Sequence, residues 1–187
     1  MEDKQIIEES RTFIGFKKGP KQQQIDCLVA LLEKRDVMAI LPTGFGKSII
    51  YQLAPFVTSL KRGIPLADIK SCVIVITPLN SIMVDQCTSL SKMGIKSCAL
   101  DYQCTQAETF LVDDIDDDMD DEEISDAQEI STLVSLEDVA SGKYQVIYAH
   151  PEALISTRKG DLLMNNLSKN KHLSCIAIDE AHMILEW

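Results

Sequence analysis

The chain has 187 residues and is 45% hydrophobic, which suffices for one domain with an apolar core and excludes a wholly disordered chain. Its formal net charge is −11, but nine of its 29 acidic residues lie within residues 113–123. Outside that segment 20 acids face 18 bases, so the charge does not exclude a domain that binds nucleic acid. The charged N-terminus predicts no secretion signal, and the longest apolar run, residues 72–76, is too short to span a bilayer.

The N-terminal part of the chain divides at Pro20. Residues 1–19 are polar apart from a small aromatic group, so they predict either an aromatic lid beside a ligand site or a frayed end. Residues 20–34 carry apolar side chains at helical spacing after the proline, and they predict a helix. We therefore expect a polar segment at 1–19 and a folded domain over 20–187.

Apolar runs and helical periodicities then alternate along the chain. The expected strands cover residues 37–41, 72–77, 96–100, 145–149 and 173–178. The expected helices cover 49–60, which Pro55 should end or kink, 81–93, 133–140 and 151–157, and 162–170 is an amphipathic or loop segment. Continuous β-branched runs suit parallel strands covered on both faces. The pattern predicts an α/β domain with a mostly parallel sheet and helices on both faces.

A glycine loop, Leu-Pro-Thr-Gly-Phe-Gly-Lys-Ser at residues 41–48, lies between an expected strand and an expected helix. Such a loop directs backbone N–H groups towards a polyphosphate at the positive end of the helix, and its glycines allow the bend. Its lysine can reach the β- and γ-phosphates of ATP, and its serine hydroxyl can hold Mg²⁺. The generic pattern has glycine where Leu41 stands, so a chance turn is the alternative. The candidate nucleotide-binding residues are Thr43, Gly44, Phe45, Gly46, Lys47 and Ser48.

Two acids, Asp179 and Glu180, end the last expected strand. An acid at this place can bind Mg²⁺ opposite Ser48, while its neighbour deprotonates the attacking water. The Asp-Glu dipeptide is also common at strand ends, but the glycine loop upstream favours the catalytic interpretation. Open parallel sheets bind ligands beyond the carboxyl ends of their strands, and each polar signature of this chain lies at such an end.

Six cysteines are present, and none has the C-x2-C spacing of a zinc site. Cys72 and Cys175 lie inside apolar runs, so we expect free, buried thiols in a reducing compartment. These features predict a soluble intracellular protein without zinc.

Residues 101–142 interrupt the alternation of strands and helices. The acidic run 113–123 repels itself and cannot bury apolar surface, so we expect a solvated, disordered insert over about 105–140. The alternative is a docking element for a basic protein partner such as a histone, or one that occupies the domain's own DNA groove.

Four segments together resemble superfamily 2 helicases, and among them the RecQ family. They are the glycine loop 41–48, Ile-Thr-Pro-Leu-Asn-Ser-Ile-Met-Val-Asp-Gln at 76–86, Tyr-Ala-His-Pro-Glu at 148–152 and Asp-Glu-Ala-His at 179–182. Tyr51-Gln52, the segment 78–86 and Trp187 are the RecQ-like features. The resemblance implies the first RecA-like P-loop NTPase domain, truncated, of an ATP-dependent 3′–5′ DNA helicase. It also implies a nuclear location, a role in DNA repair and recombination, and a second RecA-like domain that this chain lacks.

The resemblance also implies roles for single residues. Lys47 and Ser48 bind phosphate and Mg²⁺, Asp179 binds Mg²⁺, Glu180 activates water and His182 couples hydrolysis to DNA contact. A glutamine before the first strand reads the adenine edge. Counting back without gaps selects Gln24, whereas a short insertion or deletion selects Gln22 or Gln23.

Two segments are expected to contact the backbone of single-stranded or forked DNA, because helix N-termini and small polar groups suit phosphates. The candidate DNA-binding residues are Pro78, Leu79, Ser81, Asp85, Gln86, His150, Pro151 and Glu152. Ser81 can equally be a helix cap. The family often has a base where Val84 stands and a small hydroxyl where His150 stands, so His150 can also be an ordinary strand-end residue.

Two other functions remain open at this stage. Asp-Glu-Ala-His also occurs in superfamily 2 helicases that act on RNA, and the acidic insert is compatible with a non-catalytic interaction module. Under the leading interpretation the 187 residues bind ATP with Mg²⁺ weakly and unwind nothing alone, because translocation needs two domains that close on ATP.

Overall fold

The computed structural model describes residues 2–78, 80–100 and 134–182. The acidic run 113–123, Leu79 and Trp187 lie outside the described residues, so the predictions for them stay predictions. None of the described helices is long and apolar enough to cross a membrane.

Four parallel strands form one sheet in the order β2-β3-β1-β4. They are β1 Cys72–Ile76, β2 Ser97–Leu100, β3 Val146–Ala149 and β4 Leu173–Ile178. This arrangement confirms the predicted parallel sheet. Ile76 at the end of β1 is in register with both Ala149 and Ile178, so three strands end at one edge of the sheet.

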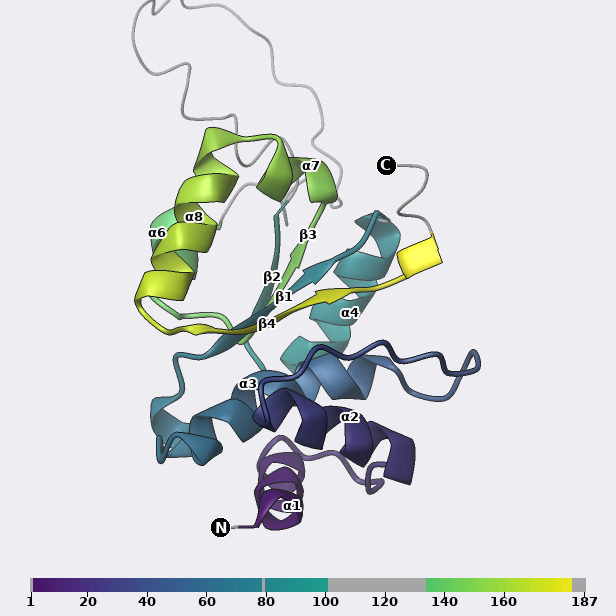
Figure 1. Cartoon of the computed structure of the whole chain (residues 1–187). Helices are drawn as coiled ribbons and strands as arrows, with labels where there is room; N and C mark the ends of the chain where they lie inside the picture. The colour runs from purple at the N-terminus through teal and green to yellow at the C-terminus, as the bar shows by residue number, and fades with distance from the viewer. Residues whose placement is uncertain (1, 79, 101–133, 183–187) are drawn as a thin grey trace, which may run out of the picture.

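Helices cover both faces of the sheet, as Figure 1 shows. They are α1 Asp3–Phe13, α2 Gln22–Leu32, α3 Ser48–Lys61, the short 3-10 helix η1 Leu66–Asp68, α4 Asn80–Lys92, α6 Leu136–Ala140, α7 Pro151–Ile155 and α8 Arg158–Lys169. Side chains of β1 alternate between two cores. Val73 and Val75 pack with α1 to α4, whereas Ile74 and Ile76 pack with α6 to α8.

The N-terminal segment is not a frayed end, because residues 3–13 form helix α1. Ile6 and Ile7 are only 1% and 2% exposed and belong to the same core as α2 and α3. Lys61 at the end of α3 also forms a 2.6 Å ion pair with Asp3. Ser10 is buried on the inner face of α1, and this polar residue conceals the apolar stripe in the sequence.

The expected strand at 37–41 is wrong. The segment forms no strand, and none of the backbone hydrogen bonds among the described residues joins it to β4, the edge strand. It does retain the alternation of an extended chain: Ala39 and Leu41 contact the core, while Ile40 is 87% exposed. An apolar run becomes a strand only where a neighbour supplies ladder hydrogen bonds, and the local sequence cannot specify that neighbour.

Two further expectations about helices were alternatives, and the structure excludes one alternative in each case. Pro55 does not end α3, which continues to Lys61 with the proline buried inside it. The helix ends before Gly63, whose φ of +76° breaks the turn. Likewise, the ambiguous segment 162–170 belongs to a helix that begins at Arg158, because the Thr157 hydroxyl caps it by accepting a hydrogen bond from the Gly160 N–H at 3.0 Å.

Not all of the described cysteines are buried, contrary to the expectation for Cys175. Cys72 and Cys98 are buried in the sheet, whereas Cys175 on the edge strand β4 is partly exposed. Edge position alone does not explain the exposure of Cys175, because Cys98 is buried on β2, the other edge strand of the described sheet. The described residues contain no group of three or more His, Cys, Asp or Glu side chains that could hold a metal ion.

Candidate active site

The glycine loop leads directly into α3, a helix of 14 residues that begins at Ser48. Gly44 and Gly46 have φ of +74° and +88°, a region that side chains with a Cβ rarely adopt. Within the part of the chain that the structure describes, no acceptor takes the backbone N–H groups of Gly46, Lys47 or Ser48. The loop therefore presents N–H donors at the positive end of a helix, which is the arrangement that binds phosphate.

The Lys47 side chain is partly buried and folds back over its own loop. Its ammonium donates to the backbone carbonyl oxygen of Leu41 at 3.4 Å, near the limit for a hydrogen bond. This contact is weak, so it leaves the ammonium free to move towards a bound anion.

Gln24 on α2 holds the glycine loop by hydrogen bonds to its backbone. Its amide nitrogen donates to the carbonyl oxygens of Phe45 and Gly46 at 3.1 and 2.9 Å, and its amide oxygen accepts from the Lys21 N–H at 2.7 Å. Of the three adjacent glutamines, Gln24 is the buried one. Gln22 points to solvent, where it bonds to Asp26.

Lys21 adds a second contact to the same loop. Its ammonium lies 3.8 Å from the centroid of the Phe45 ring and donates to the Phe45 carbonyl oxygen at 3.2 Å. A cation over an aromatic face is worth about 0.5–1 kcal/mol at an exposed site. The sequence analysis missed this residue, since a lysine before a helix gives no signal of a contact 24 residues away.

Asp179 directly follows β4, and its side chain contacts α3, the helix that follows the glycine loop. The Tyr51 hydroxyl donates to Oδ2 of Asp179 at 3.2 Å, across 128 residues of sequence. Burial is the main reason why the pKa of Tyr51 lies well above its ordinary value, and an interaction with the Ser48 side chain partly opposes that rise. Ser48 begins the helix that carries Tyr51, so this hydrogen bond links Asp179 to the helix of the other predicted metal ligand.

Glu180 adopts a strained backbone conformation beside Asp179. Its φ is +52°, which is uncommon for a residue other than glycine, and its N–H donates to Oδ1 of Asp179 at 3.1 Å. Such strain is concentrated at functional sites. The Glu180 carboxylate also lies 3.3 Å from Nδ1 of His182, which remains largely exposed. Glu180 thus contacts two other predicted residues, Asp179 and His182.

The predicted DNA-binding segments lie at the same edge of the sheet. Residues 77–78 follow β1 and residues 150–152 follow its neighbour β3, and the Thr77 N–H links the two strand ends by donating to the Ala149 carbonyl oxygen at 3.1 Å. The Asp179 N–H donates to the Ile76 carbonyl oxygen at the end of β1 at 3.0 Å. Ser81, Asp85 and Glu152 are exposed, whereas Pro151 is buried. The Ser81 and His150 side chains make no cap hydrogen bond among the described residues.

Gln86 is the predicted DNA-binding residue that faces inward. Its amide oxygen accepts a hydrogen bond from the Gln52 amide at 3.0 Å, which joins α4 to α3. Tyr148 is buried beside them in β3, in edge contact with Tyr51 at a centroid distance of 6.4 Å. Burial raises the pKa of Tyr148 to about 12. Tyr51 and Gln52 were noted in the sequence without a role, because contacts over such separations leave no local signal.

The residues at this place fit Mg²⁺ bound with a nucleotide. A serine hydroxyl and a carboxylate are hard oxygen donors, and Mg²⁺ usually takes one or two protein ligands together with phosphates and water. Ser48 and Asp179 supply that pair.

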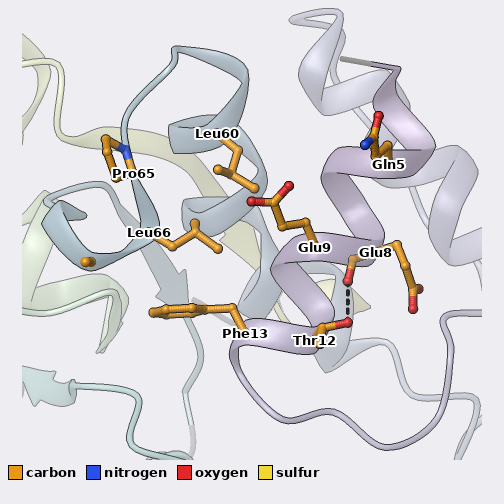
Figure 2. Close-up of a pocket in the computed structure, with 9 residues that line it drawn as sticks. Gln5, Glu8, Glu9, Thr12, Phe13, Leu60, Pro65 and Leu66 are labelled. Carbon is orange, nitrogen blue, oxygen red and sulfur yellow. Dashed lines mark hydrogen bonds between the residues drawn. The ribbon is translucent and has the colours of Figure 1, made fainter.

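A separate groove of about 740 Å³ lies between α1 and the segment that follows α3 (Figure 2). Phe13, Leu60 and Leu66 line it, and the Glu9 carboxylate lies over it. None of the predicted site residues lines this groove.

The sequence of the chain matches the model of one protein family. The sequence model described as "DEAD/DEAH box helicase" matches residues 21–187. This range includes the glycine loop, Gln24 and the Asp-Glu-Ala-His segment.

The similar curated proteins carry helicase names. "ATP-dependent helicase wrn-1" of Caenorhabditis elegans is 31% identical over 94% of this chain, which covers 13% of that protein. "ATP-dependent DNA helicase RecQ" of Synechocystis sp. is 30% identical over the whole chain and 31% of its own length. "Probable ATP-dependent DNA helicase RecS" of Bacillus subtilis is 31% identical over 94% of the chain and 27% of its own length. The chain thus spans less than a third of each of these relatives.

Proposed function

Since the chain belongs to the DEAD/DEAH box helicase family and is RecQ-like, with the RecA-like parallel sheet of that family, we propose that it is the first motor domain of a 3′–5′ DNA helicase, formed by residues 20–187. In this function it binds ATP with Mg²⁺ and single-stranded or forked DNA. One observation carries the proposal: the Tyr51 hydroxyl, on the helix of the glycine loop, holds the carboxylate of Asp179 at 3.2 Å. This contact unites two motifs that a chance glycine turn would leave apart.

The proposed roles follow from charge and geometry. The loop N–H groups and Lys47 bind the phosphates, and Ser48 with Asp179 would hold Mg²⁺. When bound, Mg²⁺ neutralises charge on the phosphates. Glu180, whose carboxylate is partly exposed beside Asp179, takes the proton of the attacking water, and His182 contacts Glu180 and links it to bound DNA.

Gln24 is our candidate for the residue that reads adenine, because it is the glutamine that touches the loop. Its amide nitrogen is engaged by two loop carbonyl oxygens, so a bidentate pair with adenine requires one of these bonds to open. Its amide oxygen has one lone pair beyond the bond from Lys21.

DNA as the substrate, rather than RNA, rests on the names of the relatives. We propose that residues 78–86 and 150–152 contact the DNA backbone and that unwinding requires a second RecA-like domain. A nuclear location and a role in repair or recombination are proposed on the same basis. The acidic run 113–123 is proposed to be solvated, with a basic protein as its possible partner.

Nucleotide binding by the 187 residues is the first test. We expect a fluorescent ATP analogue to bind in the presence of Mg²⁺, and Lys47→Ala to weaken binding at least tenfold. Lys18→Ala is the matched control, because Lys18 is an exposed lysine remote from any predicted motif, and it should bind like the unaltered chain. Equal binding by both variants would contradict the proposal.

Nucleic-acid preference is the second test. Single-stranded DNA and RNA of one sequence should compete unequally for the chain, with DNA preferred, and unwinding of forked DNA by the chain alone should stay at background. A preference for RNA would favour another branch of superfamily 2, and robust unwinding by these residues would overturn the two-domain requirement.

A further inference from the structure

We propose that Tyr51 is a positioning residue that fixes the carboxylate of Asp179 in the orientation needed to hold nucleotide-bound Mg²⁺. The inference rests on the proposed function and deepens it. It assigns a task to a side chain of α3 that is neither part of the glycine loop nor one of the two acids.

Both oxygens of Asp179 are restrained by separate donors. Oδ2 accepts from the Tyr51 hydroxyl at 3.2 Å, and Oδ1 accepts from the Glu180 N–H at 3.1 Å. A carboxylate with one restrained oxygen can still rotate about its terminal torsion, whereas two donors on opposite oxygens select one orientation. The lone pairs that remain on each oxygen are available to a cation.

Tyr51 itself is held rigidly. It is 7% exposed, and its ring packs edge-on against Tyr148 of β3 with an interplanar angle of 83°. It lies one turn after Ser48 on the same helix. The phenol therefore ties Asp179, which follows β4, to the helix that begins with the other predicted metal ligand.

The geometry separates this task from ordinary packing. The ring of Tyr51 contributes apolar contact to the core, and phenylalanine would preserve that contact. The hydroxyl contributes the bond to Asp179. Tyr51→Phe therefore removes the hydrogen bond that restrains the Asp179 carboxylate and retains the packing of the ring.

The test measures how strongly Mg²⁺ assists nucleotide binding by the full chain. The Kd of a fluorescent ATP analogue is measured once in the presence of Mg²⁺ and once in the presence of EDTA. The ratio of the Kd in EDTA to the Kd in Mg²⁺ is then compared between variants. Loss of a hydrogen bond to a charged group predicts that Tyr51→Phe lowers this ratio about tenfold, with the Kd in EDTA unchanged. Tyr144→Phe is the matched control, because it removes one phenol from the opposite face of the sheet.

A double variant distinguishes positioning from a general structural effect. If Tyr51 acts through Asp179, Tyr51→Phe should change the ratio little further in a chain that already carries Asp179→Asn. Additive effects, an unchanged ratio in Tyr51→Phe, or loss of folding by Tyr51→Phe would each overturn the inference. If the unaltered chain binds the analogue in neither condition, the proposed function itself fails, which is a different result.

Discussion

The side-chain amide of Gln24 donates to the Gly46 carbonyl oxygen at 2.9 Å, and an ideal Cβ on Gly46 would lie 3.0 Å from the same nitrogen. The glutamine and the glycine are thus fitted to each other. With φ of +88° at Gly46, the close approach accounts for glycine at this place in two independent ways. The phosphate loop is held by a side chain of α2 as well as by its own sequence.

This contact predicts that Gln24→Ala weakens nucleotide binding without unfolding the chain. The change removes two hydrogen bonds to the loop and one to Lys21, each worth about 0.5–1.5 kcal/mol, so we expect at least a tenfold higher Kd for ATP with Mg²⁺. Gln23→Ala, at an exposed position one residue earlier, should change neither Kd nor Tm. Equal effects of the two variants would show that the register of the glutamine is wrong.

The sequence predicted the strands that are buried on both faces, because their apolar content does not depend on which neighbour they pair with. β1 is the clearest case, with all five residues buried. Segment 37–41 has a similar apolar content but lacks ladder hydrogen bonds among the described residues. Whether it forms a strand therefore depends on pairing with a distant segment, which the local sequence does not specify. The same reasoning explains α1, where the buried Ser10 hides the inner face.

The residues of the candidate site also fall into two groups, those with a local sequence signal and those whose contacts only the fold reveals. Its loop and its two acids carry local signals, namely glycines before a helix and carboxylates after a strand. The groups that assemble them do not: Tyr51 meets Asp179 over 128 residues and Gln52 meets Gln86 over 34. Neither spacing follows from periodicity within one element, so those contacts required the fold.

The hydrogen bond between Gln52 and Gln86 gives a second prediction. It joins the helix of the phosphate loop to a predicted DNA-binding segment, and Gln52 is 6% exposed. In urea unfolding, a double-mutant cycle of Gln52→Ala and Gln86→Ala should give a coupling free energy of about 0.5–1.5 kcal/mol. Each single change leaves one amide of the pair without its partner, so the double change should cost less than the sum of the two single changes.

An exposed pair on α2 provides the control for that cycle. Gln22 donates to Asp26 at 2.7 Å on the surface, one turn apart, and such pairs couple by at most about 0.5 kcal/mol. A coupling at Gln52 and Gln86 no larger than this would show that the two helices are held together without the amide bond.

Alkaline pH should destabilise the fold through two thiols of the sheet, the buried Cys72 and the partly exposed Cys175. Burial raises the pKa of Cys72 to about 12 and that of Cys175 to about 11, against 9.0 for an ordinary thiol. Above pH 9 the unfolded chain loses these protons while the native chain keeps them, so the free energy of unfolding is intact below pH 9 and falls as the pH rises towards 11 and 12.

Each such thiol adds up to about 1.4 kcal/mol per pH unit to that loss. Cys72→Ala should therefore flatten the dependence of the free energy of unfolding on pH between 9 and 11, measured by urea titration. Val73→Ala, at the next buried position of β1, should lower stability at every pH and leave the slope unchanged. Equal slopes in the two variants would exclude Cys72 as a source of the alkaline loss.

The contact between α7 and α8 predicts an effect opposite to the usual one for glycine in a helix. Gly160 lies in the first turn of α8, where alanine normally adds about 0.5–1 kcal/mol of stability. A Cβ there would lie 2.6 Å from the Ala153 carbonyl oxygen and closer still to that of Leu154, and backbone oxygens of α7 cannot rotate away. We expect Gly160→Ala to cost about 1–3 kcal/mol and to lower Tm in a thermal melt. Gly19→Ala, where no atom lies within 4 Å of the added Cβ, should leave Tm unchanged or raise it. A higher Tm for Gly160→Ala would mean that α8 lies farther from α7, and hence from the predicted DNA-binding residues 150–152, than the structure shows.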